Sequence, residues 1–533
     1  MATKISSKYD HIKKALIQPG SPKVWKLIPR EEKIGTPTKM TLGERNLEKM
    51  NKTILLVGET GTGKSTLINA LVNYAMGVEW EDDVWFQIVE DEKRSQSESQ
   101  TSDVMVYQIF GFEDKTLPYS LTIIDTPGYG DTRGTEQDAI VSQRLLDLFR
   151  SKEGVHEMDA VGLVLKASEN RVSDRLMYIF NSVVSLFGKD MEKKIVPLIT
   201  YSDGVTPENA LKALEAADIK CAKDDENEPV YFMFNNRQTT ERNKKNKIAL
   251  KGAWDMTMDQ IKEFSDFLGK NEPQKLKKTV EVLNSHVRIT ACIQNLQERI
   301  KLTELKQKEI QQTREALEKH QEEMKNSQDF TYEVDESYKE KETISGGYWG
   351  LGFYEGAVTC NVCKENCHYP GCTVAWSPEG CEVMKDGHCT SCSRKCPASD
   401  HVKEERRYVT KTKKVKKTNE DMKREYEKGK ESCDQTTDIL ETLEETKNKL
   451  QREKDECLEE VYQHVVKLEK IALNANSAST YGHLDFLIEK MKEKGDTQKK
   501  RKLVEMKGRM DEDKGVKKAA RYGFSTLKAA FKK

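Results

Sequence analysis

A glycine-rich segment around residue 60 has the residue types and the spacing that bind the phosphates of a nucleotide. Gly58-Glu59-Thr60-Gly61-Thr62-Gly63-Lys64-Ser65-Thr66 matches G-x-x-x-x-G-K-[ST], in which glycines let backbone N–H groups surround the phosphates. We expect Lys64 to reach the β- and γ-phosphates, Ser65 to bind Mg²⁺ and Thr66 to contact the α-phosphate. An apolar strand over 53–58 and a helix over 65–76 are placed to present this loop.

A second apolar strand, over 121–125, ends in D-x-x-G, a pattern typical of nucleotide-hydrolysing proteins. We expect Asp125 to hold Mg²⁺ through water and the Gly128 N–H to contact the γ-phosphate. Thr101, in a polar loop, is the candidate that completes the metal shell, and an ordinary loop threonine is the alternative. The candidate catalytic residues are Lys64, Thr101, Asp125 and Gly128, and the candidate Mg²⁺ ligands are Ser65, Thr101 and Asp125.

The strand over 194–202 leads into Thr200-Tyr201-Ser202-Asp203, where guanine-binding proteins commonly carry N-K-x-D. The Asp203 carboxylate can accept hydrogen bonds from guanine N1–H and N2–H₂, a donor pair that adenine lacks. Threonine replaces the usual Asn and Tyr201 the usual Lys, so a helix N-cap or turn acid is the alternative for Asp203. The pattern favours GTP over ATP, with Thr200 and Asp203 on the base side.

Three segments carry a family resemblance. Asp125-Thr126-Pro127-Gly128-Tyr129-Gly130-Asp131 is similar to the D-T-P-G-F-G-D of septins, while Leu186-Phe187-Gly188 and Phe234-Asn235-Asn236-Arg237 resemble segments of the GIMAP family. Residues 50–268 therefore resemble the septin/GIMAP/chloroplast-import-receptor branch of P-loop GTPases. The resemblance implies binding of GTP or GDP with Mg²⁺, dimerisation across the nucleotide face, and contact of Asn235 with the base.

Catalytic groups for hydrolysis are less evident in the sequence. Phosphoryl transfer needs a positioned water and charge stabilisation, commonly from Gln and an arginine finger. Tyr129, not Gln, follows D-x-x-G, and Arg133 is interpreted as a surface charge or as a residue that acts across a dimer. We therefore expect slow hydrolysis that self-association accelerates.

Eight of the twelve cysteines fall between residues 360 and 396, in a repeated C-x₂-C-x₃-C pattern. Closely spaced thiolates of this kind suit tetrahedral Zn²⁺. The candidate Zn²⁺ ligands are Cys360, Cys363, Cys367, Cys372, Cys381, Cys389, Cys392, Cys396, His368 and His401. They suffice for two structural zinc sites whose pairing the sequence leaves open. A disulfide knot and a RING-type ubiquitin ligase are the alternatives, and the cysteine order departs from the usual RING pattern.

The chain divides into six expected parts. Residues 1–50 are predicted to be a polar arm, and residues 51–270 an α/β P-loop GTPase domain, with a mostly parallel sheet and helices on both faces. Apolar residues at threes and fours predict coiled-coil helices over 275–327 and 418–473. Between them lies a cysteine-rich zinc module with flanking strands, 328–416, which we place at the tip of an antiparallel helical hairpin. Residues 474–533 are predicted to be a basic tail with an amphipathic helix.

Composition supports several parts rather than one large compact enzyme. Of 533 residues, 36% are hydrophobic and 33% charged, against about 45–50% and about 25% in typical globular chains. The net charge of −1 hides a basic tail, since residues 490–533 carry sixteen Lys and Arg against six Asp and Glu. That tail could contact an anionic membrane, bind a partner groove or remain solvated, and nucleic-acid binding is disfavoured. No apolar run predicts a membrane span or a secretion signal, so a cytoplasmic location is expected.

These observations predict a GTP-binding switch whose nucleotide state controls self-association. A homodimer or oligomer would form through the GTPase face, the coiled coil or both, and a protein partner would bind the zinc tip. The alternatives are a non-hydrolysing scaffold or immune-type adaptor, and a membrane-associated assembly protein.

Overall fold

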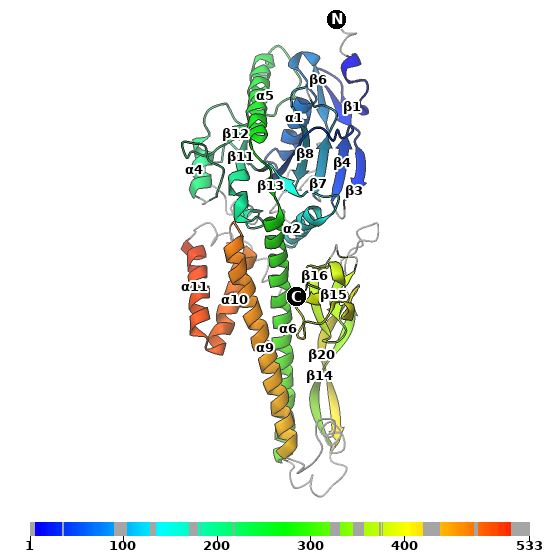
Figure 1. Cartoon of the computed structure of the whole chain (residues 1–533), viewed down its shortest axis with the longest axis vertical. Coiled ribbons are helices and arrows are strands. Elements are labelled where there is room, and N and C mark those ends of the chain that lie inside the picture. Colours follow the sequence, from blue (N-terminus) through cyan, green and yellow to red (C-terminus); the bar gives the residue numbers. More distant parts are fainter. Residues whose placement is uncertain are drawn as a thin grey trace. The chain divides into compact units, whose positions relative to one another are not determined.

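The computed structural model describes residues 6–34, 37–89, 104–113, 115–127, 135–169, 180–181, 183–216, 219–319, 331–344, 356–372, 375, 377–418, 437–473 and 478–512. The chain forms two compact units (Figure 1). The α/β unit comprises residues 1–283 and 469–533, and the helix–ribbon unit comprises residues 284–468.

An eight-stranded sheet forms the centre of the α/β unit. Its strands, in spatial order, are β12 (Phe232–Met233), β11 (Ile195–Thr200), β10 (Ala160–Lys166), β5 (Asn51–Gly58), β8 (Ser120–Asp125), β7 (Met105–Ile109), β4 (Thr38–Leu42) and β3 (Arg30–Lys33). The strands from β12 to β8 are parallel, β7 is antiparallel to β8, and β3 is antiparallel to β4. The prediction of a mostly parallel sheet is confirmed, with an antiparallel portion at one edge.

Both faces of this sheet are covered. Ile54 and Leu56 of β5 lie in the main hydrophobic core, with residues of α1 (Lys64–Ala75) and α5 (Lys247–Lys270). Leu55 and Val57 point to the opposite face, since side chains alternate along a strand, and they are fully buried as well. Other described helices of the sheet region include α2 (Thr135–Arg150), α4 (Glu208–Ala216) and short 3₁₀ turns at Ser6–Tyr9, Trp80–Asp82 and Lys189–Lys194.

The prediction of a polar arm over residues 1–50 is wrong. Besides β3 and β4, this region contains β1 (Lys14–Gln18) and β2 (Lys23–Leu27), which form a three-stranded sheet with β6 (Val84–Gln87). These strands are short and mostly polar, so their own sequence gives little signal. Partners remote in sequence stabilise this region: Trp25 of β2 pairs in register with Phe86 of β6, whose ring lies 5.1 Å from that of Tyr9. A two-stranded pair of β9 (Glu157–Met158) and β13 (Gln274–Lys275) completes the unit's described strands.

The helix–ribbon unit combines two antiparallel helices with a long two-stranded ribbon (Figure 1). Helices α6 (Lys277–Lys319) and α9 (Thr437–Ile471) run in opposite directions. The Cys457 Sγ contacts the Cys292 carbonyl, whereas Arg314, later in α6, hydrogen-bonds Glu444, earlier in α9. Strands β14 (Thr331–Thr343) and β20 (Arg406–Thr418) pair along their whole lengths. The cysteine-rich module beyond the ribbon contains β15 (Gly356–Cys360), β16 (Glu365–Cys372), β17 (Met384–Lys385), β18 (His388–Cys389), β19 (His401–Glu404) and two 3₁₀ turns, Pro378–Gly380 and Ala398–Asp400.

The cysteine-rich module does not lie at the tip of the helical hairpin, which corrects our expectation. Asn295 of α6 donates to the Ser391 carbonyl at 3.3 Å, although α6 continues to Lys319. From residue 295 to the end of α6 is about 36 Å at helical rise, and a thirteen-residue strand spans about 43 Å. The ribbon therefore has the length needed to return the module to the first half of α6. The direction in which the ribbon runs depends on tertiary contacts that the sequence pattern does not predict.

Part of the predicted heptad seam in α9 is buried. Cys457, Val461 and Leu468 are each less than 2% exposed, whereas Lys447 is exposed. The part of the predicted 418–473 helix between residues 419 and 436 lies outside the described residues. Whether the two helices twist as a coiled coil stays a prediction.

Within the region predicted to be a basic tail with an amphipathic helix, residues 478–512 form two helices that the charge pattern did not predict. The helices α10 (Ala478–Lys494) and α11 (Thr497–Glu512) are joined by a tight turn at Gly495 and by an ion pair of 2.5 Å between Lys507 and Asp485. Leu484, Leu487 and Leu503 are fully buried. The amphipathic helix expected over 514–533 falls outside the described part of the chain. Among the described helices, none is both long and apolar enough to cross a bilayer.

Candidate nucleotide site and cysteine centre

The loop between β5 and α1 has the backbone shape that phosphate binding requires. Gly61 and Gly63 adopt φ values of 80° and 91°, in the left-handed region that favours glycine. Gly58 lies so close to β10 that an added Cβ would stand 2.4 Å from the Val164 carbonyl oxygen. Helix α1 begins at Lys64, so its N-terminus follows the loop directly. Its unpaired N–H groups and dipole favour an anion there.

Lys64 is folded back over this loop. Its Nζ donates to the carbonyls of Gly58 at 2.8 Å and Glu59 at 3.1 Å. Burial lowers the pKa of Lys64, and the nearby charge of Asp125 opposes that shift. The hydroxyl of Thr60, in the same loop, is buried and has no hydrogen-bond partner among the described residues. A buried ammonium group beside a glycine loop is therefore available to an incoming phosphate.

The structure brings Asp125 to the phosphate loop. Asp125 ends β8 and pairs in register with Leu56, two residues before Gly58. The next side chain, Thr126, fixes this strand end by donating its hydroxyl to the Leu56 carbonyl at 3.0 Å. Thr101 and Gly128, the other expected contributors, lie outside the described residues. The metal-binding roles of Ser65, Thr101 and Asp125 therefore stay predictions.

The two base-side segments also meet. The Thr200 hydroxyl donates to the Thr62 carbonyl at 2.6 Å, which ties the end of β11 to the phosphate loop. Beyond it, Asn235 Nδ2 donates to the Ser202 carbonyl at 2.9 Å, so the Asn235 and Asp203 loops are held together. Asp203 Oδ1 accepts the Val205 N–H at 3.0 Å, in a turn that leaves its residue exposed.

Two base-side residues were not assigned from the sequence. Both side-chain polar atoms of Asn236 are buried without a hydrogen-bond partner among the described residues. Tyr201 is 59% exposed, has a φ of 54° and lies under Lys166, whose Nζ is 5.8 Å from the ring centroid. In the sequence, these two residues could have been found only because Asn236 follows Asn235 and Tyr201 lies two residues before Asp203.

Helix α1 also holds the segment that leads toward Thr101. Asn69 Oδ1 accepts the N–H groups of Ile88 and Val89, at 2.9 and 3.1 Å, and Asn73 Oδ1 accepts that of Phe86 at 2.9 Å. Both asparagines are essentially inaccessible to solvent. The helix that begins at the phosphate loop therefore fixes the chain through residue 89. The sequence signal for this contact is the presence of Asn69 and Asn73 on an otherwise apolar face of the helix.

Among the described residues, the cysteine centre contains three groups of candidate metal ligands rather than the expected two. In each group the donor atoms lie within 4.8 Å of one another. The groups are Cys360, Cys363, Cys392 and Cys396; Cys367, Cys389, Cys392 and His401; and His368, Cys372 and Cys381. All ten ligands predicted from the sequence are used, and Cys392 belongs to two groups.

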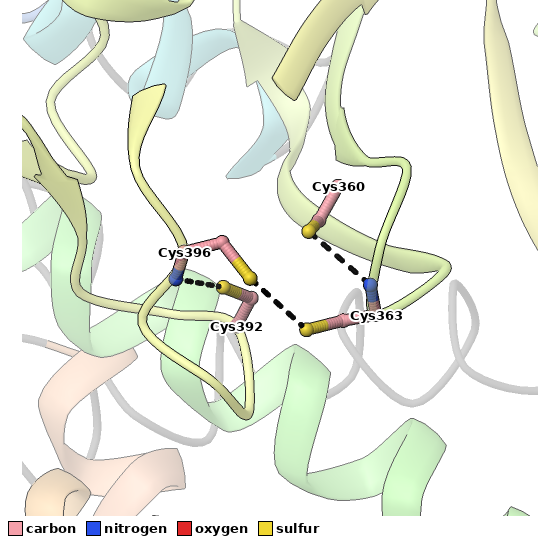
Figure 2. A group of neighbouring side chains, drawn as sticks. All are labelled: Cys360, Cys363, Cys392 and Cys396. Atoms are coloured by element: carbon pink, nitrogen blue, oxygen red, sulfur yellow. Dashed lines mark hydrogen bonds between the residues drawn. The ribbon is translucent and has the colours of Figure 1, made fainter. Parts of the chain in front are cut away.

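The local backbone favours thiolates in the first group (Figure 2). The Cys363 N–H points to the Cys360 Sγ and the Cys396 N–H to the Cys392 Sγ, each at 3.3 Å, and the Cys363 and Cys396 sulfurs are 3.6 Å apart. A hydrogen bond to the charged form of a group stabilises that form. None of these four cysteines forms a disulfide in the structure.

His401 in the second group is oriented like a metal ligand. Its Nδ1 lies 2.9 Å from the Pro397 carbonyl, a contact that requires the proton on Nδ1. Its Nε2, buried among the group's thiols, has no hydrogen-bond partner among the described residues. Histidine ligands commonly donate one ring N–H to a carbonyl while the other nitrogen binds the metal.

Cysteines outside the groups have a different environment. Burial raises the pKa of Cys221 and of Cys292 to about 12, and it also raises that of Cys457. Thiols with such raised pKa values stay protonated at neutral pH and react slowly. We therefore interpret these three cysteines as packing residues.

Comparisons with known proteins match the part of the α/β unit that contains the glycine-rich loop. Residues 48–151 match the family model described as Septin. Human Septin-5 is 28% identical over 179 residues, which cover 31% of this chain and 43% of that protein. Rat Septin-4 is 26% identical over 171 residues, covering 29% and 33%. The chain thus spans less than half the length of these curated relatives.

Solved structures show weaker likeness. Toc33 from Arabidopsis thaliana, in complex with GDP and Mg²⁺, is 17% identical and matches 42% of this chain and 88% of that chain, with a TM-score of 0.30.

Proposed function

We propose that the chain carries a septin-like P-loop GTPase domain and is a slow GTPase whose nucleotide state controls self-association. One observation carries the proposal: the Thr200–Thr62 hydrogen bond joins the phosphate loop to the base-side loops. This bond links the residues proposed to bind phosphate to those proposed to select guanine, although they are remote in sequence, and it thereby supports a single nucleotide site. A phosphate-binding loop that matched by chance would lack this second half.

Mg²⁺ fits the donor set of this site, with Ser65 and Asp125 beside the phosphate loop and Thr101 as the third expected ligand. The ion would neutralise charge on the β- and γ-phosphate oxygens. The chain's own part is to hold the nucleotide and supply the Lys64 charge. Tyr129 in place of Gln favours slow turnover, since a tyrosine positions water poorly.

Guanine selection is assigned to Asp203, with Asn235 and Tyr201 beside it. The exposed Asp203 carboxylate keeps acceptor capacity beyond its Val205 contact, because a carboxylate has about four lone-pair sites. The Tyr201 ring takes the sequence place of the usual lysine, and it offers a flat apolar surface to the base.

The first experiment measures GTP binding and turnover in Lys64→Ala and Asp125→Ala. We expect Lys64→Ala to weaken GTP binding at least tenfold, because it removes the one buried ammonium group at the phosphate loop among the described residues. Asp125→Ala is expected to remove the Mg²⁺ dependence of turnover. Unchanged GTP affinity in Lys64→Ala would refute the assigned phosphate site.

The second experiment tests guanine recognition by Asp203→Asn. Xanthine carries a carbonyl where guanine carries N2–H₂, so an asparagine amide can donate to it. We expect at least about 100-fold weaker GTP binding, from the loss of two charge-assisted hydrogen bonds, and a gain in xanthosine triphosphate binding. Asp224→Asn is the matched control, because Asp224 Oδ1 accepts the Glu226 N–H in the same kind of turn. Equal effects in both variants would exclude base recognition by Asp203.

Self-association is proposed across the nucleotide face, as the family resemblance implies. We expect turnover per chain to rise with protein concentration, and the mass in solution to differ between GDP and a non-hydrolysable GTP analogue. A turnover rate independent of concentration would exclude activation by dimerisation. Retention of GTP for hours without phosphate release would instead favour the scaffold or adaptor function, for which the Tyr129 substitution is the supporting observation.

The cysteine centre is proposed to bind structural Zn²⁺. Two of its groups offer four protein ligands each, and cysteine-dominated shells of this kind are closed to substrate. Burial holds the pKa of Cys381 well above its usual value, whereas a bound cation would favour the thiolate. The zinc would stabilise the module that a protein partner is proposed to bind.

A further inference from the structure

We propose that the cysteine centre binds three zinc ions, with Cys392 bridging two of them and the Glu382 carboxylate completing the third site. The proposal rests on the zinc assignment above and concerns the number of ions and two ligand roles. Glu382 was not among the ligands expected from the sequence.

The count of ligands motivates the bridge. The first two groups contain four ligands each only if Cys392 serves both, and together they use seven residues. His368, Cys372 and Cys381 are then left as a separate group, and none of them occurs in the other two. A thiolate has more than one lone pair, so one sulfur can bind two cations. Two ions would therefore leave an entire buried donor group without a cation.

The third group has the dimensions of a zinc site. Bond lengths of about 2.3 Å for Zn–S and about 2.0–2.1 Å for Zn–N give tetrahedral edges of about 3.8 Å between sulfurs and about 3.6 Å between sulfur and nitrogen. The Cys372 and Cys381 sulfurs are 4.0 Å apart, and His368 Nδ1 is 3.1 Å from the Cys381 Sγ. All three side chains are buried.

Glu382 lies beside two of the three donors of the third group. Its carboxylate is not within 4.8 Å of all three, so a turn of the side chain toward the Cys372 sulfur would be needed to place it at the missing corner. Its Oε2 is 3.3 Å from His368 Nδ1 and 3.7 Å from the Cys381 Sγ. A carboxylate ligand at about 2.0–2.2 Å from zinc gives edges of about 3.3–3.4 Å to nitrogen and about 3.5–3.7 Å to sulfur. The Glu382 side chain is 2% exposed, and its carbonyl is fixed by the Arg288 Nε at 2.8 Å. A buried carboxylate is costly unless a cation or hydrogen bonds stabilise it.

An ion pair between His368 and Glu382 is the competing explanation. In that case the imidazolium would donate to the carboxylate, and the third group would bind no metal. The two explanations differ in zinc content and in the response to Glu382→Gln. A glutamine can still accept a hydrogen bond from imidazolium, but it is a poor zinc ligand.

The test is zinc content of the purified full chain, by elemental analysis against quantitative amino-acid analysis. We expect about three zinc ions per chain. About two ions would overturn this proposal and leave structural zinc intact, whereas absence of zinc would overturn the zinc assignment itself. Because this measurement uses the unaltered chain, it does not depend on whether a variant folds.

Variants then assign the ligands, with the zinc released rapidly to a colorimetric chelator as the readout. Glu382→Gln is expected to release about one ion, and its matched control Glu379→Gln, an exposed acid in the same segment, none. Cys363→Ser, confined to the first group, is expected to release about one ion and Cys392→Ser about two. If Glu382→Gln releases no more zinc than Glu379→Gln, Glu382 is not a zinc ligand. If Cys392→Ser releases no more zinc than Cys363→Ser, Cys392 does not bridge two ions. Retained GTP binding shows that the α/β unit of each variant is folded.

Discussion

Replacement of Arg299 by methionine is expected to loosen the cysteine-rich module from α6. The Arg299 guanidinium binds Glu365 with two hydrogen bonds, from Nε at 3.2 Å and from the terminal nitrogen at 3.0 Å, and it also donates to the Ser391 carbonyl. Each side chain of this pair is only 9% exposed. Glu365 precedes the zinc-ligand candidate Cys367 by two residues, so the pair anchors the centre of the module.

The expected cost follows from what the substitution leaves behind. Removing one partner of a buried ion pair costs about 3–5 kcal/mol, because the other charge stays buried and uncompensated. Glu365 keeps one donor, the Ser393 N–H at 2.9 Å, which places the cost at the lower end of that range. We expect about 3 kcal/mol, equivalent to a roughly 150-fold change in an opening equilibrium.

Native-state hydrogen exchange of the full chain is the appropriate assay, because the chain has two units and global unfolding would mix them. The amides to follow are those of Cys389 and Ser393, which donate to the Cys396 carbonyl and to Glu365. Protection of both is expected to fall by about two orders of magnitude in Arg299→Met.

Two further variants make the reasoning refutable. Arg314→Met removes an exposed pair with Glu444 on the same helix and is expected to cost less than about 1 kcal/mol. The double variant Arg299→Met/Glu365→Gln removes both charges, and it is expected to recover at least half of the loss. A cost below about 1 kcal/mol in Arg299→Met, or a double variant that is no more stable, would show that the buried pair does not anchor the module.

Three other outcomes are expected. Gly58→Ala should lower the free energy of unfolding by about 1–3 kcal/mol and weaken GTP binding, because its Cβ would stand 2.4 Å from the Val164 carbonyl oxygen. An unchanged melting temperature would contradict this close approach. Gly252→Ala in α5 is its control with the opposite sign, since no atom lies within 4 Å of the added Cβ, and stability should rise by about 0.5–1 kcal/mol. Burial and nearby positive charges lower the pKa of His464 to about 4, below its unfolded value of about 6.5. The unfolded state therefore binds a proton more readily, so the folded state loses stability as the pH falls from about 6.5 toward 4 and keeps its full stability above about pH 6.5. His464→Gln should reduce the stability difference between pH 6.5 and pH 5 by about 1.6 kcal/mol, measured by native-state hydrogen exchange of α9 amides. An equal pH dependence in both proteins would contradict it.

The sheet and the nucleotide loop could be predicted because their signals are local. The strands β5, β10 and β11 are continuous apolar runs, and buried parallel strands require such runs. The phosphate loop combines this strand signal with fixed glycine positions. By contrast, β4 reads T-K-M-T-L and becomes buried only because β7 and β3 lie on either side of it. Its burial depends on neighbours rather than on its own composition.

The cysteine centre was predictable in its members but not in its grouping. Spacing identified all ten cysteine and histidine candidates, because C-x₂-C places two sulfurs near one ion. Which pairs share an ion depends on the turns that bring Cys360 near Cys396 and His368 near Cys381. Glu382 carried no signal, since a single acid in a charged chain is uninformative. The position of the module along α6 depends on the direction of the ribbon, which no local pattern encodes.

The charge distribution along the ribbon has a consequence for how chains meet one another. Strand β14 carries five acidic and two basic side chains, and β20 carries seven basic and none acidic. Glu336 accordingly pairs with Lys413, and Glu340 with Lys411. Each strand attracts the other but repels a second copy of itself, although both have an open edge among the described strands. Salt screens such surface charges, so association of like edges between molecules, β14 with β14 or β20 with β20, is expected to increase with ionic strength.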